Sequence, residues 1–109
     1  MRLDKWLWAA RFYKTRSLAT DEIGKGRISV NAQAAKPSRE LRPGDRIELR
    51  QGAVLRTVVV VALSDSRGPA PAAQALYAET EESIAAREKA ARERREAARK
   101  QEQAWRVVD

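Results

Sequence analysis

The first apolar residues of the chain recur at the spacing of one helix face. They stand at i, i+3, i+4 and i+7, and they are Leu3, Trp6, Leu7 and Ala10. Asp4 falls in the first turn, where a negative charge suits the helix dipole. The pattern predicts a short helix near residues 3–10. We expect Trp6 in the core and Asp4 in a structural role, ordering the first turn or holding an arginine.

A second short helix is predicted a few residues later. Three apolar residues would form its buried side: Leu18, Ala19 and Ile23. Thr15 is a candidate N-cap, and Gly24 suits the position just past the end of the helix. The two helices would therefore meet at an angle, with residues 14–16 at the corner between them.

The middle of the chain shows the alternation of strands. Ile28 and Val30 point one way within residues 27–31, residues 46–50 alternate again, and residues 55–63 are rich in valine. Pro43 and Gly44 stand where a type II turn prefers them. We therefore predict an α+β fold, in which two short helices pack on a small antiparallel sheet.

The chain changes character after residue 63. Residues 64–73 contain Gly, Pro and Ser and are typical of a linker, whereas residues 80–104 are rich in the strong helix formers Ala, Glu and Arg. We divide the chain into a folded domain at 1–63, a linker at 64–75 and a mostly helical extension at 76–109. The extension would be anchored near Leu76 and Tyr77 and otherwise solvated.

The positive charge is confined to the first part of the chain. The net charge is +7, and residues 1–67 contain 14 Lys and Arg against 7 Asp and Glu, whereas residues 68–109 contain eight of each. A basic surface that belongs to a folded region indicates a protein that meets a polyanion. The extension, in contrast, is charge-balanced.

The composition argues against catalysis. The chain has no Cys and no His, which removes thiol nucleophiles, disulfides, the commonest general base and the commonest metal ligands. No segment approaches the roughly 20 apolar residues that cross a bilayer. We therefore expect no catalytic residue, no metal, no cofactor, no small-molecule substrate and no membrane association, in a cytoplasmic protein.

Three short stretches resemble the α-L RNA-binding motif that defines the S-four domain. They are residues 2–7 (RLDKWL), 16–19 (RSLA) and 26–31 (GRISVN). The longer string over residues 2–16, together with residues 36–38 and the Leu-Tyr segment at 76–83, is similar to the bacterial ribosome-associated heat shock protein fifteen family. The resemblance covers most of residues 2–89.

This resemblance implies a helical corner that binds structured RNA. It further implies binding to the large ribosomal subunit, in the state that has dissociated while still carrying a nascent chain on tRNA, and hence a role in rescue or recycling. The family often has Asn-Gly after the first strand, whereas this chain has Asn31-Ala32. Because Ala disfavours positive φ, the turn type implied by the family is an open question at this position.

The candidate RNA-binding residues cluster on the helices, the corner and the loop after the first strand. They are Arg2, Lys5, Arg11, Lys14, Thr15, Arg16, Ser17, Lys25, Arg27, Lys36, Ser38 and Arg39. Lys and Arg neutralise phosphates and release counterions. Thr15 and Ser17 either contact phosphate or only cap the second helix, and Trp8 either stacks on a base or packs internally, the latter being favoured.

Two other functions remain open from the sequence. The chain could be a protein-interaction adaptor that works through the helix at 80–104, or its RNA-binding domain could act on tRNA or messenger RNA, because phosphate geometry recurs in all of these targets. The same basic surface is compatible with DNA. We expect a monomer away from the ribosome.

Overall fold

The computed structural model describes residues 1–107, with side chains described through residue 102. The last two residues of the expected extension lie outside this range. The helices are α1 (Leu3–Ala9), α2 (Arg16–Gly24), α3 (Ala70–Gln74) and α4 (Glu81–Val107). The strands are β1 (Ile28–Val30), β2 (Gln33–Ala34), β3 (Arg46–Gln51), β4 (Val54–Val60) and β5 (Tyr77–Glu79).

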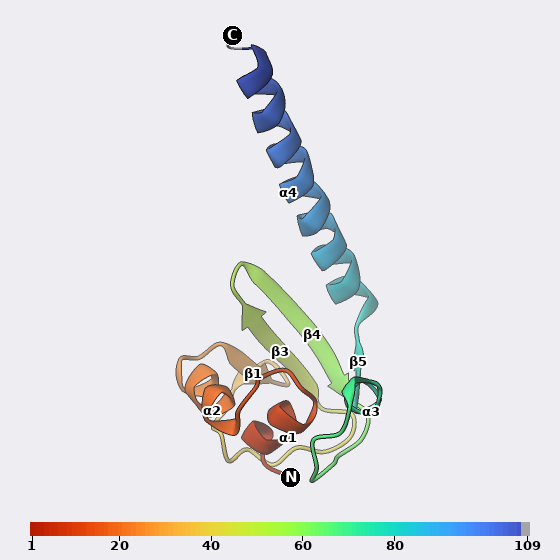
Figure 1. The fold of residues 1–109 in the computed structure, drawn as a ribbon. Coiled ribbons are helices and arrows are strands. Elements are labelled where there is room, and N and C mark those ends of the chain that lie inside the picture. Colours follow the sequence, from red (N-terminus) through yellow and green to blue (C-terminus); the bar gives the residue numbers. More distant parts are fainter. Residues whose placement is uncertain (108–109) are drawn as a thin grey trace.

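The strands form one antiparallel sheet in the order β2-β1-β3-β4-β5. Alternate residues of β1, β3 and β4 face the same side and are buried: Ile28, Val30, Ile47, Leu49, Val58 and Val60. They form a single core with the apolar stripe of α1. The predicted α+β architecture is therefore confirmed, with α1 and α2 beside the sheet (Figure 1).

Local sequence signals account for the two first helices. Trp6 is fully buried and its indole N–H donates to the Ala62 carbonyl over 3.0 Å. Thr15 caps α2 as predicted, because its hydroxyl accepts from the Leu18 N–H. The expectation for Gly24 was wrong by two positions: Gly24 is the last helical residue, and Gly26 takes the left-handed conformation after the Lys25 cap.

The β1–β2 connection is a tight turn made of Asn31 and Ala32. Asn31 and Ala32 have φ values of 51° and 64°, and Val30 pairs with Gln33 across them. Two left-handed residues in a two-residue loop define a type I′ hairpin. Alanine therefore occupies a conformation that favours glycine, and the Asn31 side chain supports it by accepting from the Arg46 N–H over 2.9 Å. The predicted type II turn at Pro43-Gly44 also forms, with φ of 96° at Gly44.

The segment expected to be a linker is structured. It contains α3, which begins with Pro71 in its first turn, and it packs against α1 through a hydrogen bond from the Arg67 guanidinium to the Trp8 carbonyl. Beyond it, β5 pairs with β4 in the register Val60–Tyr77. The sheet thus extends past the expected boundary at residue 63, because its last strand comes from the segment assigned to the extension.

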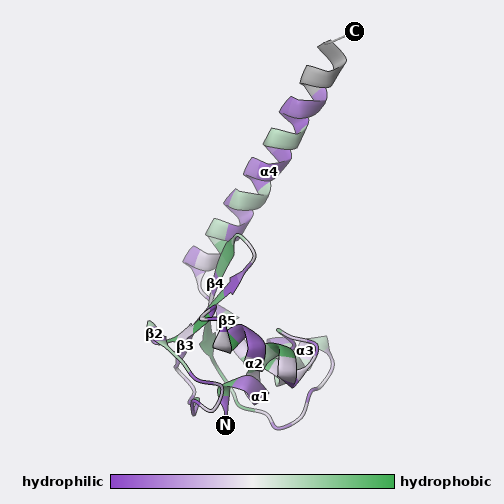
Figure 2. Cartoon of the chain, turned by 90° about the vertical axis from the view of Figure 1, so that its left-hand side faces the viewer, coloured by the Kyte–Doolittle hydropathy of each residue, from purple (hydrophilic) through white to green (hydrophobic). Residues whose placement is uncertain are grey.

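Helix α4 leaves the sheet beside β5 and projects well beyond the rest of the molecule (Figure 1). Polar residues dominate its length, with only pale apolar patches between them (Figure 2). Thr80 caps its first turn by accepting from the Ser83 N–H. No helix within residues 1–107 is long and apolar enough to cross a membrane.

Candidate nucleic-acid interface

One buried carboxylate organises the corner between α1 and α2. Asp4 is 4% exposed, and it accepts two hydrogen bonds from the Arg2 guanidinium at 3.2 and 3.3 Å. Nε of the Arg16 guanidinium lies 3.3 Å from Oδ2 of the same carboxylate. The Lys5 N–H and the Thr20 hydroxyl also donate to it. Asp4 thus holds two arginines that are far apart in the sequence in one place.

The electrostatics of this cluster favour the charged form of Asp4. Burial by itself raises the pKa of Asp4, but hydrogen bonds from Arg2 and Arg16 and the charge of Arg16 outweigh burial, so the pKa lies below its ordinary value. Both guanidiniums remain about half exposed, at 48% for Arg2 and 45% for Arg16. Their outer N–H groups are therefore free to meet a ligand while the inner ones are fixed.

Two shallow hollows flank Arg16 on the surface. One, of about 430 Å³, is lined by Lys5, Trp8, Lys14, Thr15, Arg16 and Asp65. The other, of about 380 Å³, is lined by Asp4, Arg16, Ser17, Thr20 and Asp21. We call six of the candidate residues around these hollows the basic corner: Arg2, Lys5, Lys14, Thr15, Arg16 and Ser17. The first-turn N–H groups of α2 lie in the same place, where anions are favoured.

The loop after β2 lies against the start of α1. The Leu3 N–H donates to the Arg39 carbonyl and the Asp4 N–H to the Pro37 carbonyl. The backbones of Arg2 and Glu40 form an isolated antiparallel β-bridge. These bonds carry Lys36, Ser38 and Arg39 to the side of the basic corner. Within the described residues, neither Lys36 nor Lys14 forms an ion pair.

The remaining candidate residues lie elsewhere. Lys25 and Arg27 follow the far end of α2, a helix of nine residues and hence about 13 Å in length, and both pair with Glu22. Arg11 follows the end of α1 and donates to the Gly68 carbonyl over 2.9 Å. The structure thus divides the twelve candidates into a central group at the corner and peripheral ones.

Asp4 was expected to hold an arginine and it holds two, whereas the sequence did not indicate two other neighbours of the basic corner, Asp65 and Thr20. Asp65 approaches Lys5 at 3.7 Å from the segment that was expected to be a linker, and no local pattern signals this contact. Thr20 had a weak signal, since it stands one turn after Arg16 on the same face of α2. Trp8 is partly buried against the core, with an edge in the hollow beside Lys14. No group of acidic side chains within the described range is suited to hold a metal ion.

Comparisons with known proteins relate the chain to a family. The S4 domain family, the S-four domain of the sequence analysis, matches residues 1–47, which contain the whole basic corner and the loop beside it. The chain is 52% identical over 91 residues to the heat shock protein 15 homolog of Haemophilus influenzae, covering 84% of this chain and 70% of that protein. It is 46% identical over 66 residues to the RQC P-site tRNA stabilizing factor of Bacillus subtilis, covering 61% and 77%.

A solved structure shares the fold. It is described as the trimeric structure of Vibrio cholerae heat shock protein 15, and it matches with a TM-score of 0.83 at 52% identity, over 86% of this chain and 95% of that one. The fold and the corner thus define an S4-domain protein, a class that binds RNA. Within that class, the chain belongs to the heat shock protein 15 family.

Proposed function

We propose that this protein binds structured RNA of the large ribosomal subunit through the basic corner. The observation that carries the proposal is that Asp4 fixes the half-exposed guanidiniums of Arg2 and Arg16 beside the N-terminus of α2. We call these three residues the Asp4 clamp. Guanidinium forks and outward N–H groups are the donors that phosphate oxygens require. A rigid pair of this kind recognises where phosphates lie, and hence the shape of the RNA.

The adjoining residues extend this surface to both sides. Lys14 and Lys5 add charge at the hollow beside Trp8, and Lys36, Ser38 and Arg39 add donors on the loop next to Arg2. The side chains that these elements add are the ammonium, guanidinium and hydroxyl donors that contact phosphates. Recognition would therefore depend on phosphate position and shape, as is usual for folded RNA.

We further propose a role in the rescue or recycling of dissociated large subunits that carry a nascent chain on tRNA. Two relatives support it: one is named heat shock protein 15, and the other is named for stabilising tRNA at the P site. A contact with tRNA on the large subunit would suit the same phosphate-binding corner. Binding, not catalysis, is the activity inferred here, and it needs no cofactor.

Sedimentation of a cell lysate through a sucrose gradient tests the proposal. We expect the protein to be enriched with free large subunits over intact ribosomes. If about five phosphates are neutralised, a fourfold rise in salt weakens binding by roughly 10²–10³. Confinement to the ribosome-free fractions at low salt, or a flat salt response, would contradict the proposal.

A second candidate function rests on α4, which extends far past the domain and exposes most of its surface (Figure 1). As an adaptor, the protein would recruit a partner through this helix while the corner held RNA. Alanine substitutions on the exposed face of α4 would then abolish recruitment and leave RNA affinity unchanged. Competition with purified tRNA or messenger RNA separates those targets from ribosomal RNA.

The expected monomer stays a prediction. The Vibrio cholerae relative is described as trimeric, so the association state of this chain needs its own measurement. Analytical ultracentrifugation of the free protein, across a range of concentrations, distinguishes the two states.

A further inference from the structure

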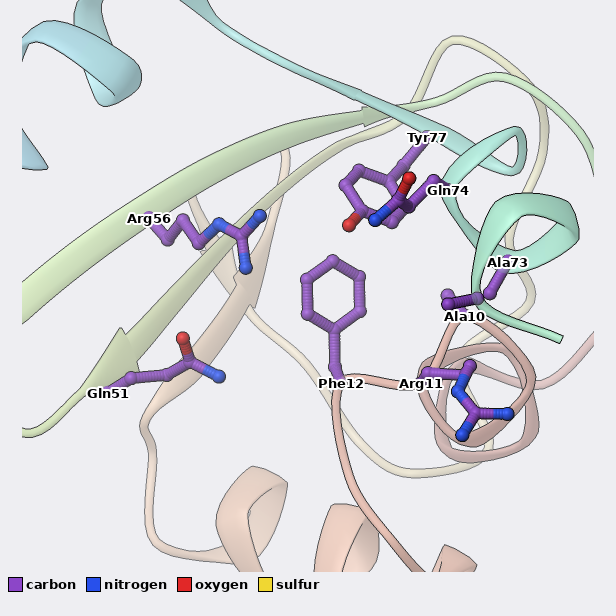
Figure 3. Close-up of a pocket in the computed structure, with 9 residues that line it drawn as sticks. Ala10, Arg11, Phe12, Gln51, Arg56, Ala73, Gln74 and Tyr77 are labelled. Carbon is purple, nitrogen blue, oxygen red and sulfur yellow. The ribbon is translucent and has the colours of Figure 1, made fainter.

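A separate pocket opens beside the end of α1, next to the basic corner but not part of it. It has a volume of about 300 Å³ and lies between the segment after α1, the β3–β4 pair, α3 and β5. Phe12 points to its centre, with Arg56 and Gln51 on one side and Tyr77 and Gln74 on the other (Figure 3). We call it the Phe12 pocket.

The interior of the Phe12 pocket is a fixed platform of rings and one guanidinium. The rings of Phe12 and Tyr77 lie 4.7 Å apart between centroids, and the Arg56 guanidinium carbon stands 5.3 Å from the Phe12 centroid and 5.8 Å from that of Tyr77. Glu79 holds Arg56 there through a 3.2 Å ion pair. Aromatic faces and guanidinium planes are the two surfaces on which unpaired nucleobases stack.

The rim supplies polar groups suited to a base and its backbone. Gln51 and Gln74 are exposed, and each amide offers both donors and an acceptor. Arg11 adds a second positive charge, and it is held at the rim by its bond to the Gly68 carbonyl and by a left-handed backbone with φ of 65°. The residues that line the pocket include two cations and no carboxylate. This balance favours a neutral flat ring attached to a phosphate.

The pocket lies within reach of RNA on the basic corner. Phe12 precedes Lys14 by two residues, so their Cα atoms are at most about 7 Å apart. We propose that the Phe12 pocket takes one unpaired nucleobase of the RNA whose phosphates lie on the basic corner. This inference rests on the proposed function and adds to it a contact with a single base, in a protein that otherwise recognises shape.

Ultraviolet crosslinking on purified large ribosomal subunits tests the inference. Stacked aromatic rings crosslink to bases at zero length, so we expect a crosslink from Phe12 or Tyr77 to one unpaired nucleotide, located by mass spectrometry and primer extension. Phe12→Leu should remove the crosslink and weaken binding about tenfold, the effect of losing one stacked base.

A second variant keeps the test independent of folding, because Phe12 also packs on Trp6. Gln51→Ala with Gln74→Ala changes only exposed amides and should lower the crosslink yield and weaken binding about fivefold. Gln101→Ala, an exposed glutamine on α4, is the matched control and should change neither quantity.

The outcomes separate the two proposals. A wild-type protein that binds large subunits with a salt-sensitive affinity but gives no crosslink from Phe12 or Tyr77 overturns the nucleobase site and leaves the corner intact. The same holds if the double glutamine variant crosslinks and binds as wild type. No binding by wild type at low salt overturns both proposals together.

Discussion

Two regions of this molecule each contain a buried carboxylate that pairs with two arginines. At the corner, Asp4 holds Arg2 and Arg16; at the root of α4, Glu79 holds Arg56 and Arg87. Both carboxylates are almost fully buried, at 4% and 7% exposure. The two regions differ in what the arginines contact: other parts of the protein in one, and solvent in the other.

The arginines on Glu79 join parts of the protein to one another. Arg56 comes from β4 and Arg87 from α4, and Ser83 completes the joint by donating to Glu79 and accepting from the Thr57 N–H. Hydrogen bonds from Arg87 lower the pKa of Glu79 to about 2, with Ser83 and Arg56 assisting against the effect of burial. Of the arginines on Asp4, Arg2 immediately precedes α1 and Arg16 begins α2, and both keep about half of their surface in solvent. Glu79 therefore attaches α4 to the sheet, whereas Asp4 holds two positive charges at the surface.

The largest effect should come from removing cations at the corner. Lys5→Ala with Lys14→Ala and Arg16→Ala should weaken binding to large subunits about 100-fold and reduce the slope of log affinity against log salt by about 2–3, one for each lost phosphate contact. Filter binding at several salt concentrations measures both quantities.

A matched variant on α4 gives the control for total charge. Lys89→Ala with Arg92→Ala and Arg95→Ala removes three exposed cations from α4. RNA affinity should change by less than about threefold, because long-range charge is screened beyond about 10 Å in ordinary buffers. Equal losses in the two triple variants would show that net charge, not the corner, binds RNA.

Next in size is the effect of Glu79→Gln on stability. The folded pKa of about 2 lies below the ordinary 4.5, so the ionised carboxylate stabilises the fold above pH 4.5 and loses this effect as the pH falls towards 2. The shift sets an upper bound of about 3 kcal/mol, and because Arg87 is 41% exposed we expect a loss of about 2 kcal/mol at pH 7.

Urea unfolding across the acid range measures this loss. The gap between wild type and Glu79→Gln should close as the pH falls from about 5 to 2, while RNA affinity at pH 7 stays the same. A gap that does not depend on pH would mean that packing, and not the ion pairs of Glu79, fastens α4.

Asp4→Asn should lower RNA affinity, the quantity that Glu79→Gln leaves unchanged, and its effect should be smaller than the stability loss of Glu79→Gln. The amide cannot hold two guanidiniums, so Arg2 and Arg16 lose their fixed positions. RNA affinity should therefore fall about tenfold, although the loss of a negative charge makes the net charge more positive by one. Affinity of the folded variant, verified by circular dichroism, measures the effect. Unchanged or tighter binding would show that Asp4 only neutralises the corner.

The features that could be predicted from the sequence are those that neighbouring residues determine. Thr15 caps the helix that follows it, Pro43-Gly44 forms its own turn, and the alternation around Ile47 identifies a buried strand. The position of residues 14–16 at the corner between two helices also followed from the sequence, because α1 and α2 are encoded in one continuous stretch. That these residues bind RNA stays a prediction.

The features that could not be predicted depend on contacts between distant residues. Glu79 meets Arg56 across 23 positions, and no local pattern distinguishes Glu79 from the solvated acids of α4 that follow it. The same holds for β5, which has only three residues and gains its stability by pairing with β4. Composition alone made residues 64–75 resemble a linker, although they contain α3 and lead directly into the strand that completes the sheet.

The smallest expected effect concerns the hairpin that leads to the loop beside the corner. Ala32 stands at φ of 64°, a conformation that costs an alanine about 1–2 kcal/mol, whereas glycine adopts it freely but loses more entropy on folding. Ala32→Gly should therefore raise the free energy of unfolding by about 0.5–1 kcal/mol. Urea unfolding measures this gain, and RNA affinity should stay within twofold because the turn itself carries no phosphate donor. Tighter RNA binding in this variant would mean that the hairpin limits how Lys36 and Arg39 meet the RNA, and would extend the binding region beyond the Asp4 clamp.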